Sequence, residues 1–191
     1  MTLTESVKTC FRKYFTFSGR ASRSEYWKFW LFWLLINVAL VLVNSAIFGP
    51  VHEIGVGTWT APDGTQTVEP FNNTIYTGGI FANVFSLAVL VPGVAVACRR
   101  LHDIGRSGWW QVMPFALIFV VTGAVIVMSV GWTAFLAGFN TPGGITVQNP
   151  SGAVFAILLI LGSFAILLFW LCKKSQPGPN TYGPNPHEVS Q

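Results

Sequence analysis

The chain has 191 residues, of which 52% are hydrophobic and 15% aromatic, but only 9% are charged. A typical soluble domain carries about 25% charged residues, so an ordinary soluble enzyme is excluded. Intrinsic disorder is excluded as well, because disordered chains are poor in aromatic residues and rich in charge. The composition predicts an integral membrane protein.

The N-terminal segment predicts an amphipathic helix. Its apolar residues recur at helical spacing, at Val7, Cys10, Phe11, Tyr14 and Phe15. Thr2 and Glu5 have the spacing of a capping box at its start. Basic flanks and aromatic residues are typical of a helix lying in the membrane interface. The alternative is a helix packed against the protein's own loops.

A turn at Gly19 separates this helix from the first apolar run. Ser22 and Glu25 again have capping-box spacing, with Ser22 as the N-cap and Glu25 reaching back to its amide. The first membrane helix should therefore begin outside the bilayer. Arg20 and Arg23 are left to contact lipid phosphate.

Four apolar runs without Asp, Glu, Lys, Arg or His predict transmembrane helices. At about 19 to 22 residues each, they are long enough to cross a hydrocarbon core of about 30 Å. The predicted spans are 29–48, 80–98, 109–130 and 154–172. The first span should remain uncleaved, because its leader and apolar core are both longer than those of a signal peptide.

The basic residues predict the orientation. All 11 Lys and Arg lie in the N-terminal segment, in loop 99–108 or in tail 173–191, and none lies in loops 49–79 and 131–153. By the positive-inside rule, the basic segments and both termini are cytoplasmic and the other two loops are outside. We expect one four-span membrane domain covering 1–191.

The outer loops predict short strands. Thr and Val residues surround Asp63-Gly64, a pair that favours a hairpin turn. In the second outer loop, Gly143-Gly144 precede a further candidate strand at 145–147.

Loop 99–108 must turn tightly, because it joins two spans with about ten residues. Gly105 and Gly108 would supply backbone freedom, and Ser107 is placed to cap the next helix. Pro92 and Pro114, within the adjoining spans, are candidates for helix kinks.

Asp103 lies near the predicted end of a helix, where an acid opposes the helix dipole. Its pairing with Arg99 or Arg100 would have the weaker residue order. We therefore expect a partner elsewhere, either a backbone amide in the turn or one of Arg20, Arg23 and Arg106.

The tail contains four prolines and two glycines between 176 and 186, which exclude a helix there. An ordinary linker would have a less distinctive composition. The aromatic Tyr182 therefore indicates that part of the tail docks against the rest of the protein.

His102 and Asp103, flanked by arginines, form the one arrangement with catalytic character. They could act as a general base beside a phosphate-binding group. The alternative is a structural turn whose arginines meet anionic headgroups. No second acid or nucleophile supports catalysis, so we expect no catalytic residue.

Metal binding is weakly indicated. Cys98 and His102 share a helix face, and Cys10 and Cys172 also lie at cytoplasmic helix ends. However, the chain has no CxxC pair, the spacing that usually marks a zinc site. We expect neither a metal nor a cofactor.

The polar residues within the spans are uncharged. Asn37 and Asn44 are seven residues apart on one helix face, which suits interhelical hydrogen bonding. The absence of ionisable groups in the spans disfavours proton-coupled transport. A channel or transporter for a neutral solute remains an alternative.

Three segments of the chain carry a family resemblance. GRASRSEYW at 19–27, RRLHDIGRSGWW at 99–110 and NTYGP at 180–184 resemble domain-of-unknown-function family 805, the YhaH-like bacterial inner-membrane proteins. The resemblance implies a multi-pass protein of the bacterial inner membrane. It implies no activity, and it does not cover the two outer loops.

The predicted fold is all-α, with four transmembrane helices, an N-terminal interfacial helix and a short outer hairpin. The hypothesis for function is a non-catalytic module that contacts lipid or scaffolds a partner through its cytoplasmic face. Alternatives are neutral-solute transport and, less favoured, an enzyme using His102 and Asp103 on a phosphate-bearing substrate.

The expected partners are anionic headgroups of the bilayer and a membrane protein or second copy, with no nucleic acid. The candidate binding residues are Arg20, Arg23, Glu25, Arg99, Arg100, His102, Asp103, Arg106, Trp109 and Tyr182.

Overall fold

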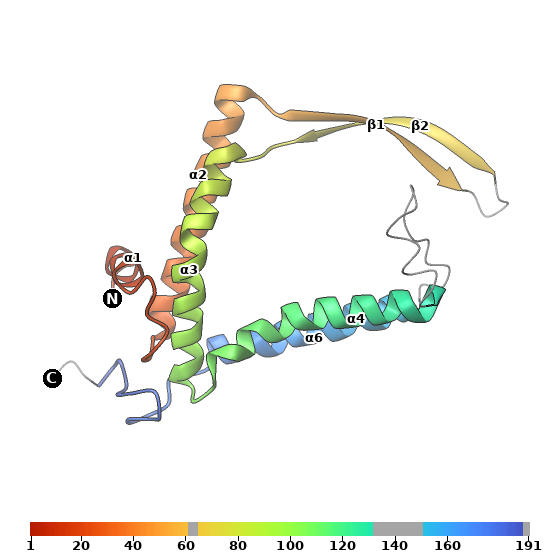
Figure 1. Cartoon of the computed structure of the whole chain (residues 1–191). Coiled ribbons are helices and arrows are strands. Elements are labelled where there is room, and N and C mark those ends of the chain that lie inside the picture. Colours follow the sequence, from red (N-terminus) through yellow and green to blue (C-terminus); the bar gives the residue numbers. More distant parts are fainter. Residues whose placement is uncertain (61–64, 132–150, 189–191) are drawn as a thin grey trace. The chain divides into compact units, whose positions relative to one another are not determined.

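The computed structural model describes residues 1–60, 65–131 and 151–188. Its contacts divide the chain into two compact units (Figure 1). The first unit comprises Met1–Tyr14 and Trp27–Gly93, and the second comprises Phe15–Tyr26 and Val94–Gln191. The elements in chain order are α1 (Leu3–Arg12), α2 (Arg23–Phe48), β1 (Val51–Thr60), β2 (Gln66–Ile75), α3 (Gly79–Asp103), the 3-10 helix η1 (Gly108–Val112), α4 (Met113–Val130) and α6 (Ser151–Cys172).

Four helical segments of the described chain are long and apolar enough to cross a membrane, as predicted. They are Arg23–Phe48, Gly79–Asp103, Gly108–Met128 and Val154–Cys172. Their apolar side chains are widely exposed; Leu42, for example, is 66% exposed and Phe119 80% exposed. Apolar surface on this scale is rare in soluble monomers and is expected where lipid surrounds the helices.

The third span differs from the continuous helix predicted for 109–130. A 3-10 helix occupies Gly108–Val112, and α4 begins only at Met113. Pro114 lies in the first turn of α4, where its missing N–H costs no helical hydrogen bond. It therefore starts a helix, and the prediction of a kink there is wrong. Pro92 does lie inside α3.

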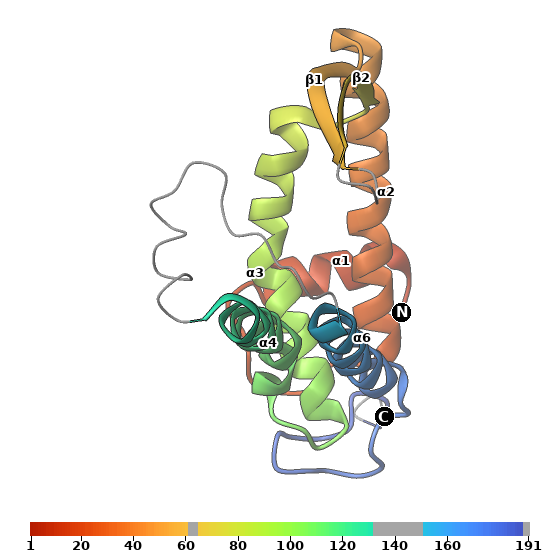
Figure 2. The same ribbon diagram turned by 90° about the vertical axis from the view of Figure 1, so that its right-hand side faces the viewer.

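In the first unit, α2 and α3 run side by side (Figures 1 and 2). The rings of Phe32 and Phe85 meet edge to face, with centroids 6.0 Å apart. The Ser86 hydroxyl donates to the amide oxygen of Asn37 at 3.3 Å, and Asn44 donates to the Thr77 carbonyl at 2.9 Å. The Asn37 contact joins two helices, as the sequence predicted, whereas Asn44 bonds to the segment that precedes α3.

Helix α1 has the predicted capping box between Thr2 and Glu5. The hydrogen bond from the Thr2 backbone N–H lowers the pKa of Glu5. The helix ends at Arg12, so Tyr14 lies beyond it, contrary to the helical pattern predicted through Phe15. The Tyr14 hydroxyl donates to the Ala88 carbonyl at 2.6 Å, a tertiary contact that sequence periodicity does not register.

Strands β1 and β2 form the predicted hairpin, as an antiparallel pair with Val51 opposite Ile75. The Phe71 ring covers Gly55, where an added Cβ would lie 2.5 Å from the ring. The predicted turn at Asp63-Gly64 and the predicted strand at 145–147 lie outside the described residues.

In the second unit, α4 and α6 pack side by side (Figures 1 and 2). Edge-to-face ring contacts occur where α4 begins, between Phe115 and Phe164 at 5.9 Å and between Trp110 of η1 and Trp170 at 5.3 Å. These aromatic contacts fix the ends of η1 and α6 from which the polar segments emerge.

Candidate functional site

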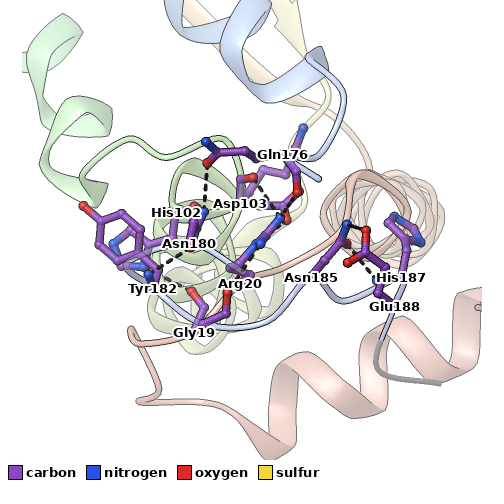
Figure 3. A network of polar contacts seen from close by, with 12 residues as sticks. Gly19, Arg20, His102, Asp103, Gln176, Asn180, Tyr182, Asn185, His187 and Glu188 are labelled. Carbon is purple, nitrogen blue, oxygen red and sulfur yellow. Dashed lines mark hydrogen bonds and ion pairs between the residues drawn. The ribbon is translucent and has the colours of Figure 1, made fainter. Parts of the chain in front are cut away.

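All ten predicted site residues belong to the second unit. The segment before α2, the C-terminal end of α3 and the tail after α6 meet there in one polar network (Figure 3). We call the buried part of this network the arginine cluster. It comprises Arg20, Glu25, Arg99, Arg100 and Asp103.

Asp103 lies at the centre of the arginine cluster. Its carboxylate accepts from Arg20 Nε at 2.9 Å and from Arg100 Nη1 at 2.5 Å, and all three side chains are buried. Arg20 is one of the partners that the sequence predicted. The expectation that Asp103 would not pair with Arg100 is wrong, because burial favours this contact over the weak dipole term that opposes it.

Arg20 also fastens the tail to the end of α3. Its two terminal nitrogens donate to the carbonyls of Gly178 at 2.7 Å and Gln176 at 2.5 Å (Figure 3). The Gln176 N–H in turn donates to the Asp103 carbonyl at 3.0 Å. The prediction that the tail docks is therefore confirmed.

Arg100 extends the same arrangement to the end of α6. Its Nε donates to the Leu171 carbonyl at 3.0 Å, and its Nη2 donates to the Lys173 carbonyl. A guanidinium suits this role because its planar fork carries five donors.

Arg99 pairs with Glu25 at 2.6 Å, again with both side chains buried. The Ser22 hydroxyl accepts from the Glu25 N–H at 3.1 Å, which confirms Ser22 as the N-cap of α2. The Glu25 carboxylate, expected to reach back to the Ser22 amide, contacts the Arg99 guanidinium. The Ala21 N–H donates to the Arg99 carbonyl at 3.0 Å and adds a backbone link.

His102 is held between the turn and the tail. Its ring stacks on Tyr182 with centroids 3.9 Å apart and planes 5° from parallel (Figure 3). Its Nδ1 lies 3.2 Å from the Gly19 carbonyl, and its Nε2 lies 3.6 Å from Cys98 Sγ. Since the Asp103 carboxylate faces arginines, the geometry gives no support to a His–Asp general base.

Cys98 and His102 lie on the same face of α3, as predicted, and their side chains contact each other. Among the residues that the structure describes, no group of three or more His, Cys, Asp or Glu side chains is placed to hold a metal ion.

The two glycines of the turn act differently. Gly105 has a φ of +75°, which favours glycine, whereas the φ of Gly108 lies outside the positive region. An added Cβ on Gly108 would lie 2.0 Å from Cys98 Sγ. The prediction of backbone freedom is wrong for Gly108, which is needed for space. Ser107 caps η1 as predicted.

The remaining predicted residues lie on the surface. Arg23 and Arg106 are exposed, and Trp109 is 81% exposed. The Arg106 guanidinium lies over the Trp170 ring, 4.5 Å from its centroid, and 6.0 Å from that of Trp110.

Sequence reasoning missed the roles of Gln176 and Asn180. Asn180 donates to the His102 carbonyl at 2.9 Å, and its side-chain oxygen accepts from the Tyr182 N–H at 2.9 Å. The second contact is an Asx turn, and Asn before Tyr-Gly-Pro is the signal that could have revealed it.

Sequence reasoning also missed a cavity of about 560 Å³ within the second unit. It lies where Phe17 and Ser18 face the last turns of α3 and the start of η1. Cys98, His102 and Trp109 contribute to its wall.

Comparison with known proteins places these features in a family. The family model described as "Protein of unknown function (DUF805)" matches residues 14–184, which include all three motif segments. The chain is 27% identical over 141 residues to Inner membrane protein YhaH of Escherichia coli (strain K12), covering 74% of this chain and 88% of YhaH. It is 32% identical over 132 residues to Inner membrane protein YhaI of the same strain, covering 69% of this chain and 80% of YhaI.

No solved structure gives a significant match to the chain. The match to the family model over most of its length, together with the inner-membrane relatives, shows that this multi-pass membrane protein belongs to the DUF805 family.

Proposed function

We propose that the protein is a non-catalytic module of the bacterial inner membrane whose second unit contacts anionic headgroups at the cytoplasmic surface. The exposed basic side chains make this contact, and the arginine cluster holds the segments that carry them. One observation supports the proposal most: the buried charges of the second unit are largely paired with each other, whereas its exposed charges are mostly basic.

The buried charges are largely matched within the protein. Asp103 accepts from two arginines, and Glu25 accepts from a third. These arginines are therefore poor candidates for direct lipid contact, although the sequence placed them among the binding residues.

The exposed charges of the described second unit are mostly basic. They comprise Arg23, Arg106, Lys173 and Lys174, with Glu188 as the exposed acid. The Glu188 carboxylate accepts from Asn185 at 2.8 Å and from the Gly178 N–H at 3.3 Å. A basic side chain near an anionic membrane surface contributes about 1 kcal/mol of attraction.

The positions of the four basic residues suit a membrane surface. Arg23 begins α2, Lys173 and Lys174 follow α6, and Arg106 precedes η1. Indole rings favour headgroup depth, and Trp110 and Trp170 flank the Arg106 guanidinium. The distribution of Lys and Arg along the sequence assigns this surface to the cytoplasm.

The interfacial placement of α1 belongs to the same proposal. Lys8 and Arg12 are exposed, so they are available to headgroups. The Phe11 ring contacts Phe29 and Phe32 at 6.1 and 6.4 Å, so α1 also packs on α2. A membrane protein partner or a second copy of the chain remains a companion proposal for the apolar surfaces of the spans.

The test uses full-length protein in nanodiscs of phosphatidylethanolamine and phosphatidylglycerol, with a fluorescent phosphatidylglycerol reporting enrichment around the protein. We expect R23Q/R106Q/K173Q/K174Q to lose most of the enrichment, and rising salt to reduce that of the wild type. The matched control K173R/K174R keeps the charge and should keep the enrichment. Unchanged enrichment in the four-residue variant would contradict the proposal.

A further inference from the structure

The cavity of the second unit has the size of a ligand site. Its volume is about 560 Å³, and small-molecule sites span about 300 to 1,000 Å³. None of the described side chains that line it carries a formal carboxylate, ammonium or guanidinium charge. A charged ligand that moved from water into this cavity would find no side chain of opposite charge there. The free-energy cost of its desolvation would therefore not be offset.

The cavity wall combines two kinds of surface. Phe17, Val94 and Val112 supply apolar side chains, and Ser18 and Gln111 supply neutral polar groups. Val94 belongs to the predicted span 80–98 and Val112 to the predicted span 109–130, each within a few residues of its polar end. With the helices crossing the bilayer over these predicted spans, the cavity would lie at the depth where a lipid changes from headgroup to acyl chain.

His102 lines this cavity, and its ring carries a hydrogen-bond acceptor. Its Nδ1 faces the Gly19 carbonyl at 3.2 Å, so we assign the ring proton to Nδ1. In the neutral ring, Nε2 is then the acceptor. Stacking on Tyr182 fixes the ring plane.

The described neighbour of Nε2 is the Cys98 thiol, at 3.6 Å. A thiol is a weak donor, and Cys98 Sγ also lies 3.6 Å from the Phe17 carbonyl, which it can use instead. A hydroxyl donor can therefore take the place of the thiol at Nε2.

We propose that the cavity binds a neutral, hydroxyl-bearing amphiphile of the monoacylglycerol class. One hydroxyl donates to Nε2 of His102, and the acyl chain lies along the apolar wall and continues into the bilayer. This site is separate from the exposed basic side chains, so either proposal can fail without the other.

Cys98 provides the readout, because it lines the cavity and lies beside the proposed headgroup position. N-ethylmaleimide labelling of the full-length protein in detergent is followed at Cys98 by peptide mass spectrometry, with exposed Cys172 as the internal control. The probes are 1-monooleoylglycerol and, with the same chain but an anionic head, oleate.

We expect monooleoylglycerol at about ten times its dissociation constant to slow labelling of Cys98 about tenfold, because labelling follows the fraction of empty sites. Labelling of Cys172 should not change. Equal protection by oleate, or no protection by monooleoylglycerol, would overturn the proposal. A Cys98 that resists labelling without added lipid would also overturn it, since the cavity would then be closed.

Two variants test the location of the site. V112W should fill the cavity and abolish protection, whereas V120W, an exposed position further along α4, should retain it. H102F removes the acceptor and should remove the preference for monooleoylglycerol over oleate. A preserved preference in folded H102F would contradict the assigned role of Nε2, even if V112W did not fold.

Discussion

Asp103 accepts a hydrogen bond of 2.9 Å from Arg20, which lies 83 residues earlier in the chain. The same carboxylate accepts from Arg100, and no part of the three side chains is substantially exposed. Two guanidinium groups therefore depend on one buried carboxylate. The site therefore joins three segments of the structure: the turn before α2, the end of α3 and the tail.

Replacing Asp103 should destabilise the protein strongly. D103N keeps the size of the side chain but leaves two buried guanidinium groups without their counter-charge, which costs about 3–5 kcal/mol. Thermal unfolding in detergent measures the loss. The control is E188Q, which removes an exposed carboxylate and should change the midpoint little; equal effects of the two variants would contradict the central role of Asp103.

Replacing Arg20 by lysine should release the tail while retaining the charge. A lysine cannot reproduce the separate donations of Arg20 to Asp103, Gly178 and Gln176. Loss of one charged hydrogen bond costs about 1.5–3 kcal/mol, so amide exchange in 176–183 should accelerate by about tenfold or more. R23K, at an exposed arginine, should leave that exchange unchanged. Unaltered exchange in R20K would show that Arg20 does not hold the tail.

Adding a methyl group at Gly108 should destabilise the turn. G108A places Cβ against Cys98 Sγ, and such overpacking costs about 1–3 kcal/mol. C98A removes the sulfur that the added Cβ would meet. G108A should therefore lower the unfolding midpoint less in the C98A background than in the wild type. Additive effects of the two substitutions would indicate that the contact is not responsible.

Acidification should weaken the N-terminus of α1. The folded-state pKa of Glu5 is lowered by its hydrogen bond from the Thr2 N–H, so its stabilising effect is present above the ordinary pKa of a glutamate. The effect is lost as the pH falls through the lowered value. Hydrogen exchange of the first α1 amides, corrected for intrinsic rates, should show this loss in the wild type and not in E5Q. The same pH response in E5Q would assign the effect to another group.

Local patterns in the sequence predicted the membrane-spanning helices and the residues at which helices begin. Runs of apolar residues predicted the four spans, and cap spacing predicted the helix starts at Thr2, Ser22 and Ser107. A length criterion alone did not predict the 3-10 segment before α4, because the position of Pro114 sets that boundary.

The buried polar contacts were predicted only in outline. Arg20 was one of several partners considered for Asp103, since sequence spacing cannot rank contacts made by tertiary packing. The sequence also did not separate buried from exposed arginines, because Arg20 and Arg23 lie three residues apart and carry the same charge, yet Arg20 is buried and Arg23 is exposed. The cavity depends on segments 17–18 and 94–112 meeting, which no local pattern encodes.

The central claim is that the exposed basic residues bind anionic lipid, whereas the buried arginines hold the structure together. Counting the lipids that the protein retains tests this claim most directly. Native mass spectrometry would compare wild type with R23Q/R106Q/K173Q/K174Q after extraction from membranes containing phosphatidylglycerol and phosphatidylethanolamine. The account predicts that the wild type retains phosphatidylglycerol preferentially and that the folded variant loses this preference. Equal phosphatidylglycerol retention by the two proteins would contradict it.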